Sequence, residues 1–124
     1  TIAQENFNKQ GLANIDLRVG NFDLLLPQII QDQEKLDFLF IDGNHRKEAT
    51  LNYFYACLDK VHEETILIFD DIYWSEGMKD AWKEIKAHPK VTVTVDLFFI
   101  GLVFFNNALK LYSAVNGIFT DEII

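Results

Sequence analysis

The residues Phe38-Leu39-Phe40-Ile41-Asp42-Gly43-Asn44-His45 indicate the architecture of this chain most directly. The first four are apolar, so the segment is predicted to be a strand buried on both faces, as in a parallel sheet with helices on either side. Ile66-Leu67-Ile68-Phe69 repeats this pattern and is followed by Asp70-Asp71. We therefore predict two parallel strands, each followed by an acidic residue.

The residues before the first of these strands alternate between helical and extended patterns. A helical rhythm over residues 2–10 is followed by Gly11, a typical residue at the end of a helix. Apolar and polar residues alternate over 15–19, which predicts a half-exposed strand that ends at Gly20. Residues 24–30 are predicted to form a short helix.

The residues after the first strand continue this alternation. A helix is predicted over 47–61, and an antiparallel pair of strands over 91–95 and 100–105. Ser75 is expected to cap a further helix. The apolar face of that helix consists of Met78, Ala81, Trp82 and Ile85.

Two further predictions concern the C-terminal third. Its aromatic residues are expected to be sheet core rather than a substrate-binding surface; they are Phe98, Phe99, Phe104 and Phe105. Asn116-Gly117 is the strongest short hairpin signal in the sequence, although the flanking residues within 109–124 are weak strands.

These elements predict an open, mostly parallel α/β sheet with helices on both faces and a terminal antiparallel β-hairpin. Ligands of such sheets bind outside the carboxyl ends of the strands. The three predicted ends carry Gly20-Asn21-Phe22-Asp23, Asp42-Gly43-Asn44-His45 and Asp70-Asp71. We therefore expect the functional residues at this edge of the sheet, named the rim below.

Asp42, Asp70 and Asp71 are candidate ligands of a divalent cation such as Mg²⁺. Crowded carboxylates repel one another unless a cation lies among them, and Mg²⁺ takes oxygen ligands. Such an ion could hold two substrate oxygens and lower the pKa of a hydroxyl. The alternative is structural: Asp42 accepts hydrogen bonds from loop amides, and Asp71 caps a turn.

His45 is a candidate general base, because histidine can accept a proton near neutral pH. The alternative is a polar loop residue that caps the following helix. Trp74 could form a wall of an acceptor pocket, although an aromatic side chain packed over a loop is the alternative. Phe22 could stack on a flat ring.

The composition argues against several classes of function. The formal net charge is −8, from 11 basic and 19 acidic residues, which disfavours binding to a nucleic-acid backbone. No stretch reaches the ~18 to 20 apolar residues that a membrane helix needs, and the N-terminus does not resemble a signal peptide. Cys57 is the only cysteine and cannot form an internal disulfide, which fits a cytoplasmic protein.

Three segments resemble class I S-adenosylmethionine-dependent methyltransferases. Residues 37–45 are similar to the fourth strand and following loop of that family, residues 66–75 to the fifth strand and its loop, and residues 19–23 to the end of the third strand. The Ile-Asp-Gly-x-His motif is similar to that of bacterial O-methyltransferase-like proteins, and the order of elements parallels catechol O-methyltransferase. The resemblance spans about residues 1–106.

The resemblance implies a Rossmann-like sheet of order 3-2-1-4-5-7-6 with an antiparallel last strand. Residues 1–124 would be the C-terminal portion of a single methyltransferase domain, with strands 3 to 7 but without strands 1 and 2 and the glycine-rich cofactor loop. The residues implied to bind S-adenosylmethionine are Gly20, Asn21, Phe22, Asp23, Asp42 and Gly43.

The resemblance also bears on the metal and the base. In metal-dependent relatives the positions of Asp42, Asp70 and Asp71 hold the metal, although the last is usually Asn. At the position of His45, those relatives carry a lysine that acts as a base. Asp71 can still bind a metal and His45 can still accept a proton, so Mg²⁺ or another divalent cation is an expected second cofactor.

The implied function is methyl transfer from S-adenosylmethionine, to an oxygen of a small-molecule acceptor, by the full-length protein, with this chain alone inactive. Two alternatives are a non-catalytic α/β module that regulates or scaffolds a partner, and a metal-dependent hydrolase that uses the three aspartates. No nucleic acid or membrane partner is expected. Since strand 3 would lack its neighbours, a homodimer or strand-swapped oligomer is expected.

Overall fold

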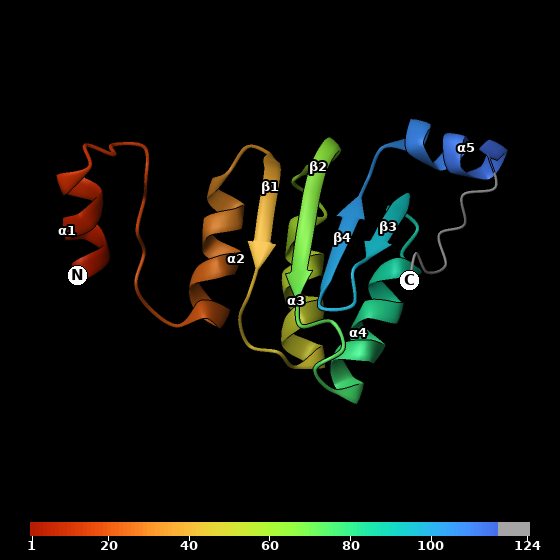
Figure 1. The fold of residues 1–124 in the computed structure, drawn as a ribbon, viewed down its shortest axis with the longest axis horizontal. Helices are drawn as coiled ribbons and strands as arrows, with labels where there is room; N and C mark the ends of the chain where they lie inside the picture. Colours follow the sequence, from red (N-terminus) through yellow and green to blue (C-terminus); the bar gives the residue numbers. More distant parts are fainter. Residues whose placement is uncertain (117–124) are drawn as a thin grey trace.

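The computed structural model describes residues 1–116 of the chain, and its centre is a four-stranded sheet of order β1-β2-β4-β3 (Figure 1). Strands β1 and β2 are parallel, whereas β4 is antiparallel to both β2 and β3. This is the order that the resemblance implies for strands 4, 5, 7 and 6, so the predicted α/β class is confirmed. The strands are β1 (Leu36–Ile41), β2 (Val61–Asp70), β3 (Val93–Asp96) and β4 (Ile100–Phe104).

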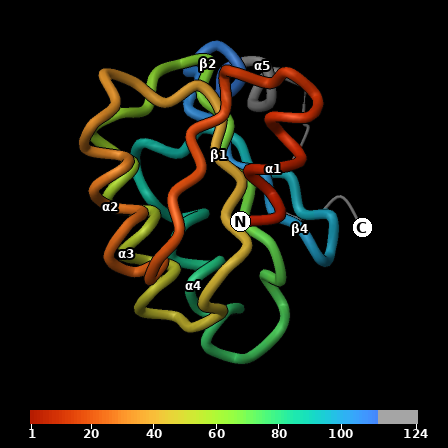
Figure 2. Tube along the Cα trace, turned by 90° about the vertical axis from the view of Figure 1, so that its left-hand side faces the viewer, coloured from red at the N-terminus to blue at the C-terminus, as the bar shows by residue number. Residues whose placement is uncertain are grey.

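The helices differ in how they contribute to the core beside this sheet. In Figure 2, α2 and α3 lie on one side of β1 and α1 on the other. Helix α1 buries none of its residues, whereas α2, α3 and α4 each contribute to the hydrophobic core. The helices are α1 (Ile2–Lys9), α2 (Phe22–Asp32), α3 (Lys47–Cys57), α4 (Glu76–Lys86) and α5 (Asn107–Asn116). None of them has the length and hydropathy of a membrane-spanning segment.

Strand β1 is buried on one face only. Ile41 is buried, but Phe38 and Phe40 are 60% and 46% exposed. The prediction of burial on both faces is therefore wrong for this strand within residues 1–116. Apolar side chains on both faces of a strand show only that each face can pack against another layer. Within residues 1–116, helices cover one face of β1, and Phe38 and Phe40 on the other face stay exposed.

Residues 15–19 do not form the predicted strand. They are extended between α1 and α2 (Figure 1), and Val19 is 76% exposed. A strand exists through hydrogen bonds to a neighbour, and β1 pairs only with β2 in the described part of the chain. The alternation is present in the sequence, but these residues have no partner strand. The predicted homodimer or strand swap stays a prediction.

Two helix boundaries differ from the sequence-based prediction, and the cap of a third helix agrees with it. Helix α2 begins at Phe22, earlier than expected, because the Asn21 side chain accepts a hydrogen bond from the Leu24 amide and caps it. Helix α3 ends at Cys57, and Val61 instead pairs in β2 with Leu36. The predicted cap of α4 is confirmed, since the Ser75 hydroxyl accepts from the Met78 amide.

The C-terminal predictions are only partly correct. Phe105 is buried, but Phe98 and Phe99 lie in the turn between β3 and β4 and are 64% and 66% exposed. Residues 107–116 form α5 rather than the first arm of a hairpin, because Ala, Leu and Lys in this segment favour a helix. Gly117, the second residue of the predicted turn, lies outside the described residues.

Candidate functional site

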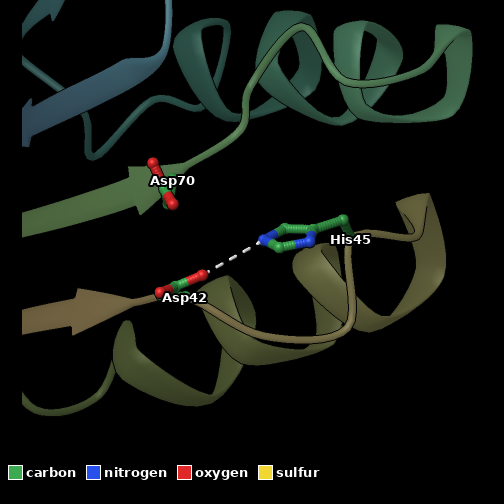
Figure 3. A group of neighbouring side chains, drawn as sticks. All are labelled: Asp42, His45 and Asp70. Carbon is green, nitrogen blue, oxygen red and sulfur yellow. Dashed lines mark ion pairs between the residues drawn. The ribbon is translucent and has the colours of Figure 1, made fainter.

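Three side chains of the rim meet at the carboxyl ends of β1 and β2. The parallel register pairs Ile41 with Phe69, so Asp42 and Asp70 follow side by side. His45 extends back toward them from the loop before α3 (Figure 3). One ligand atom each from Asp42, His45 and Asp70 lies within 4.8 Å of the other two. We name these three residues the rim cluster.

The Nε2 atom of His45 is buried and forms no hydrogen bond. It lies 3.5 Å from Asp42 Oδ1 and 3.7 Å from Asp71 Oδ2, while the side chain as a whole is 26% exposed. Leaving a buried polar atom without a partner costs about 1–3 kcal/mol. An unbonded nitrogen between carboxylates is therefore a site that can accept a proton or bind a cation.

Two residues of the rim loops have a left-handed backbone. Asn44 and Asp71 have φ angles of 50° and 54°, in a region that Asn and Asp adopt more readily than other residues with a side chain. Asn44 precedes His45 directly, and Asp71 follows Asp70. Each of these two turns therefore lies next to a residue of the rim cluster.

Asn44 connects this loop to the first turn of α2. Its Nδ2 atom donates to both carboxylate oxygens of Asp23, at 2.7 and 2.9 Å, and the Tyr53 hydroxyl donates to Asp23 Oδ1. The hydrogen bonds from Tyr53 and Asn44 lower the pKa of the Asp23 carboxyl. Burial and the bond to Asp23 raise the pKa of Tyr53 to about 12. Asp23 is thus an ionised link between α2 and α3.

The remaining predicted cofactor residues lie around this link. The ring of Phe22 packs edge-to-face on Tyr53, with centroids 5.2 Å apart. A Cβ added to Gly43 would lie 3.5 Å from the Phe22 ring, and one added to Gly20 would lie 2.7 Å from Leu25 Cδ1. The structure therefore brings residues 20–23 and 42–45 together, as the sequence predicts.

Sequence analysis missed Tyr53, although one signal was present. A tyrosine on the buried face of a helix needs a partner for its hydroxyl, and Tyr53 is 1% exposed. Asp23 and Tyr53 also border a groove of about 600 Å³ between α2 and α3, whose lining includes Pro27 and Arg46. This groove does not include the rim cluster.

The rim cluster fits a divalent cation, with a donor set that differs from the predicted one. It combines carboxylates of Asp42 and Asp70 with the imidazole nitrogen of His45. Asp71, the third predicted ligand, is close to His45 but is not among the three grouped residues. Two oxygens and a nitrogen suit Zn²⁺ or Mn²⁺ better than Mg²⁺, which prefers oxygen.

Tyr53→Phe is expected to raise the pKa of Asp23 toward its ordinary value. Because the pKa of Asp23 is lowered by folding, its contribution to stability exists above the unfolded-state pKa and is lost as the pH falls through the folded-state pKa. The variant should therefore lose stability near neutral pH and match the unaltered chain in acid. NMR titration of the carboxyl and urea unfolding at several pH values measure both effects.

The matched control is Tyr55→Phe, since the Tyr55 hydroxyl donates to exposed Glu84 at 2.7 Å. This variant should leave the pKa of Asp23 unchanged. An equal shift in both variants would contradict the role of Tyr53.

Comparison with known proteins identifies a family. A methyltransferase domain model matches residues 2–72. No curated protein matches the chain. Among solved structures, a Podospora anserina methyltransferase with SAH bound has a TM-score of 0.65 at 15% identity, covering 84% of this chain and 55% of that one.

Two further solved structures have the same fold. A Klebsiella pneumoniae protein described as an O-methyltransferase has a TM-score of 0.64 at 20% identity, covering 85% of this chain and 56% of that one. A Bacillus cereus O-methyltransferase in complex with SAH has a TM-score of 0.60 at 24% identity, with 83% and 56% covered. The chain thus spans just over half the length of each, and the likeness concerns the fold. Since the family model covers more than half of its residues, the chain belongs to the methyltransferase domain family.

Proposed function

We propose that residues 1–124 are the C-terminal portion of a domain that transfers a methyl group from S-adenosylmethionine to an oxygen of a small-molecule acceptor. The observation that supports this most is the rim cluster, in which the buried Nε2 atom of His45 is unbonded beside the Asp42 carboxylate. Family membership and the SAH bound to the Podospora anserina and Bacillus cereus proteins support the choice of cofactor.

The cofactor is proposed to lie along residues 20–23 and 42–43. Phe22 is 39% exposed and offers a ring on which the adenine can stack. The carboxylate of Asp23 already accepts hydrogen bonds from Asn44 and Tyr53. Its proposed role is therefore to hold the two loops at a fixed separation, and positioning of this kind supplies much of the rate of a transfer reaction.

His45 is proposed to act as the general base. When bound, S-adenosylmethionine would supply an electrophilic methyl group to the acceptor oxygen, and its sulfur would keep the electron pair of the broken carbon–sulfur bond. The hydroxyl proton passes to Nε2 of His45, and the carboxylates of Asp42 and Asp71 lie opposite the positive charge that the ring then carries.

A divalent cation is the competing occupant of the rim cluster. Asp42, Asp70 and His45 would hold it, and it would lower the pKa of an acceptor hydroxyl. Nε2 of His45 cannot bind a cation and take up a proton at the same time. Dependence of methyl transfer on added Mg²⁺ or Mn²⁺ therefore distinguishes the two mechanisms.

The decisive test is a methyl-transfer assay on the complete domain, with and without divalent cations, against a panel of hydroxylated acceptors. Transfer to an oxygen is expected, and failure with every acceptor would contradict the proposed function.

The 124-residue chain by itself is expected to bind S-adenosylmethionine weakly and to be inactive, because it contains no glycine-rich loop of the kind that cradles a cofactor. Calorimetry on the chain tests this expectation. Micromolar affinity would show that residues 20–23 and 42–43 suffice for binding.

A further inference from the structure

Asp96, the last residue of β3, accepts hydrogen bonds from three separate parts of the structure. Its Oδ2 atom accepts from the Tyr73 hydroxyl, in the loop after β2, and from Nε1 of Trp82 in α4 at 3.1 Å. Its Oδ1 atom accepts from the Phe98 amide, in the turn before β4, at 2.9 Å. The loop and the turn lie at the same end of the sheet (Figure 1). One carboxylate thus joins both of them to the core helix α4.

The side chain of Asp96 can accept all three hydrogen bonds because it is ionised. Burial raises its pKa, but the hydrogen bonds and the charge of Lys86 lower the pKa overall. A carboxylate has only acceptor oxygens, so every donor can point at it at once. Hydrogen bonds to a charged group are roughly twice as strong as those between neutral groups. Asp96 is therefore a firm anchor for the segments that it joins.

The turn between β3 and β4 gives Asp96 a second hold on the loop after β2. Phe98 has a φ angle of 72°, which bulky residues rarely adopt, and the bond from its amide to Asp96 keeps the turn in this form. The carbonyl of Phe99, the next residue, accepts from the Ile72 amide at 3.3 Å. Asp96 therefore fixes the loop directly, through Tyr73, and indirectly, through Ile72.

The loop that Asp96 fixes carries one carboxylate of the functional site. Asp71 is its first residue, and Asp71 Oδ2 lies 3.7 Å from the buried Nε2 atom of His45. Buried Ile72 is the one residue between Asp71 and Tyr73. A shift of the Tyr73 anchor would therefore move the carboxylate that faces His45.

We propose that Asp96 is a positioning residue for methyl transfer: through Tyr73 and the β3–β4 turn, it holds the Asp71 carboxylate opposite His45. This inference rests on the function proposed above, in which the ring of His45 becomes positively charged. Asp71 stabilises that charge only while it lies close to the ring, because the attraction weakens with distance. Asp96 lies outside the rim cluster and acts only through the loop.

The test compares two variants of the complete domain that each remove one hydrogen bond to Asp96 Oδ2. Tyr73→Phe releases the loop and should lower kcat about tenfold, because a small misplacement of a group at the site slows a transfer step. Its KM for S-adenosylmethionine should not change, since the proposed cofactor residues lie at 20–23 and 42–43. Trp82→Phe leaves the loop bonded to Asp96. Its kcat should stay within about twofold of that of the unaltered domain, although the variant is less stable.

A third variant shows whether Tyr73 acts through Asp96. Asp96→Ala should lower kcat at least as much as Tyr73→Phe, because it releases both the loop and the turn. Adding Tyr73→Phe to it should lower kcat no further, since residues that act as one unit are not additive. Equal losses of kcat in Tyr73→Phe and Trp82→Phe, or additive losses in the double variant, would overturn the proposal.

Amide hydrogen exchange in the 124-residue chain provides a measurement that does not depend on methyl transfer. In Tyr73→Phe the Ile72 amide should exchange about tenfold faster relative to the amides of β2, because the loop opens locally. In Trp82→Phe this ratio should stay as it is in the unaltered chain. A normal ratio in Tyr73→Phe would contradict the proposed anchor.

The same measurements separate this proposal from the proposed function. If the unaltered complete domain transfers no methyl group to any acceptor, the proposed function fails, whatever the exchange rates are. If the domain transfers methyl groups and Tyr73→Phe keeps a normal kcat, the positioning role of Asp96 is refuted while the function stands.

Discussion

His45→Gln in the complete domain should slow methyl transfer by about 10²- to 10⁴-fold, the contribution typical of a positioned general base. Glutamine keeps the length and a polar end but cannot take up a proton from the acceptor. The buried Nε2 atom without a hydrogen bond is the reason to expect an effect of this size, since the other two residues of the rim cluster carry only carboxylate oxygens. The measurement is kcat at saturating cofactor and acceptor.

The control for this variant is His62→Gln. His62 Nε2 is bonded to Asp37 at 2.7 Å, near the beginnings of β1 and β2 and away from the rim. Its replacement should leave kcat unchanged. If kcat of His45→Gln lies within about twofold of that of the unaltered domain, His45 is not the general base.

A metal titration of the chain shows which role His45 has. Asp70→Asn should weaken Mn²⁺ binding if the rim cluster holds the ion, because Asp70 supplies an oxygen to it. His45→Gln should weaken Mn²⁺ binding only if Nε2 is a ligand. If His45→Gln transfers methyl groups slowly but binds Mn²⁺ as tightly as the unaltered chain, His45 acts as the general base and not as a metal ligand.

The two parallel strands and the rim could be predicted because both depend on short segments, whereas the order of all four strands followed from the family resemblance. Apolar runs that end in aspartate mark β1 and β2, and the parallel register of neighbouring strands brings Asp42 and Asp70 together. The position of His45 follows from the short loop after Asp42. Local sequence pattern and topology were sufficient for this part of the site.

Other features depend on contacts between distant residues and could not be predicted. Asp23 and Tyr53 are thirty residues apart, and no local pattern links them. Residues 15–19 alternate as a strand does, but alternation does not indicate whether a neighbouring strand is present. Phe98 and Phe99 have the composition of sheet core, whereas the bonds of Asp96 place them in an exposed turn.

Trp82→Ala should lower the free energy of unfolding by about 3–5 kcal/mol, the usual effect of removing a buried tryptophan ring. Trp82 is 2% exposed and covers Gly101 of β4 so closely that a Cβ added there would lie 2.5 Å from the indole ring. No other side chain can fill that space without moving the sheet or α4. Urea unfolding measures the loss. Trp74→Ala, which removes an exposed ring, should change stability by less than about 0.5 kcal/mol.

Trp82→Phe separates packing from hydrogen bonding, because it keeps most of the ring but removes the Nε1 donor to Asp96. The lost bond should account for about 0.5–1.5 kcal/mol of the total. Burial raises the pKa of Asp96, but hydrogen bonds from Tyr73, the Phe98 amide and Trp82 outweigh it, so the pKa is lowered overall. Trp82→Phe should therefore raise the pKa of Asp96, and its stability deficit should diminish as the pH falls through that pKa. If Trp82→Ala costs no more than Trp82→Phe, packing against Gly101 contributes little, and the hydrogen bond to Asp96 accounts for most of the stability that Trp82 supplies.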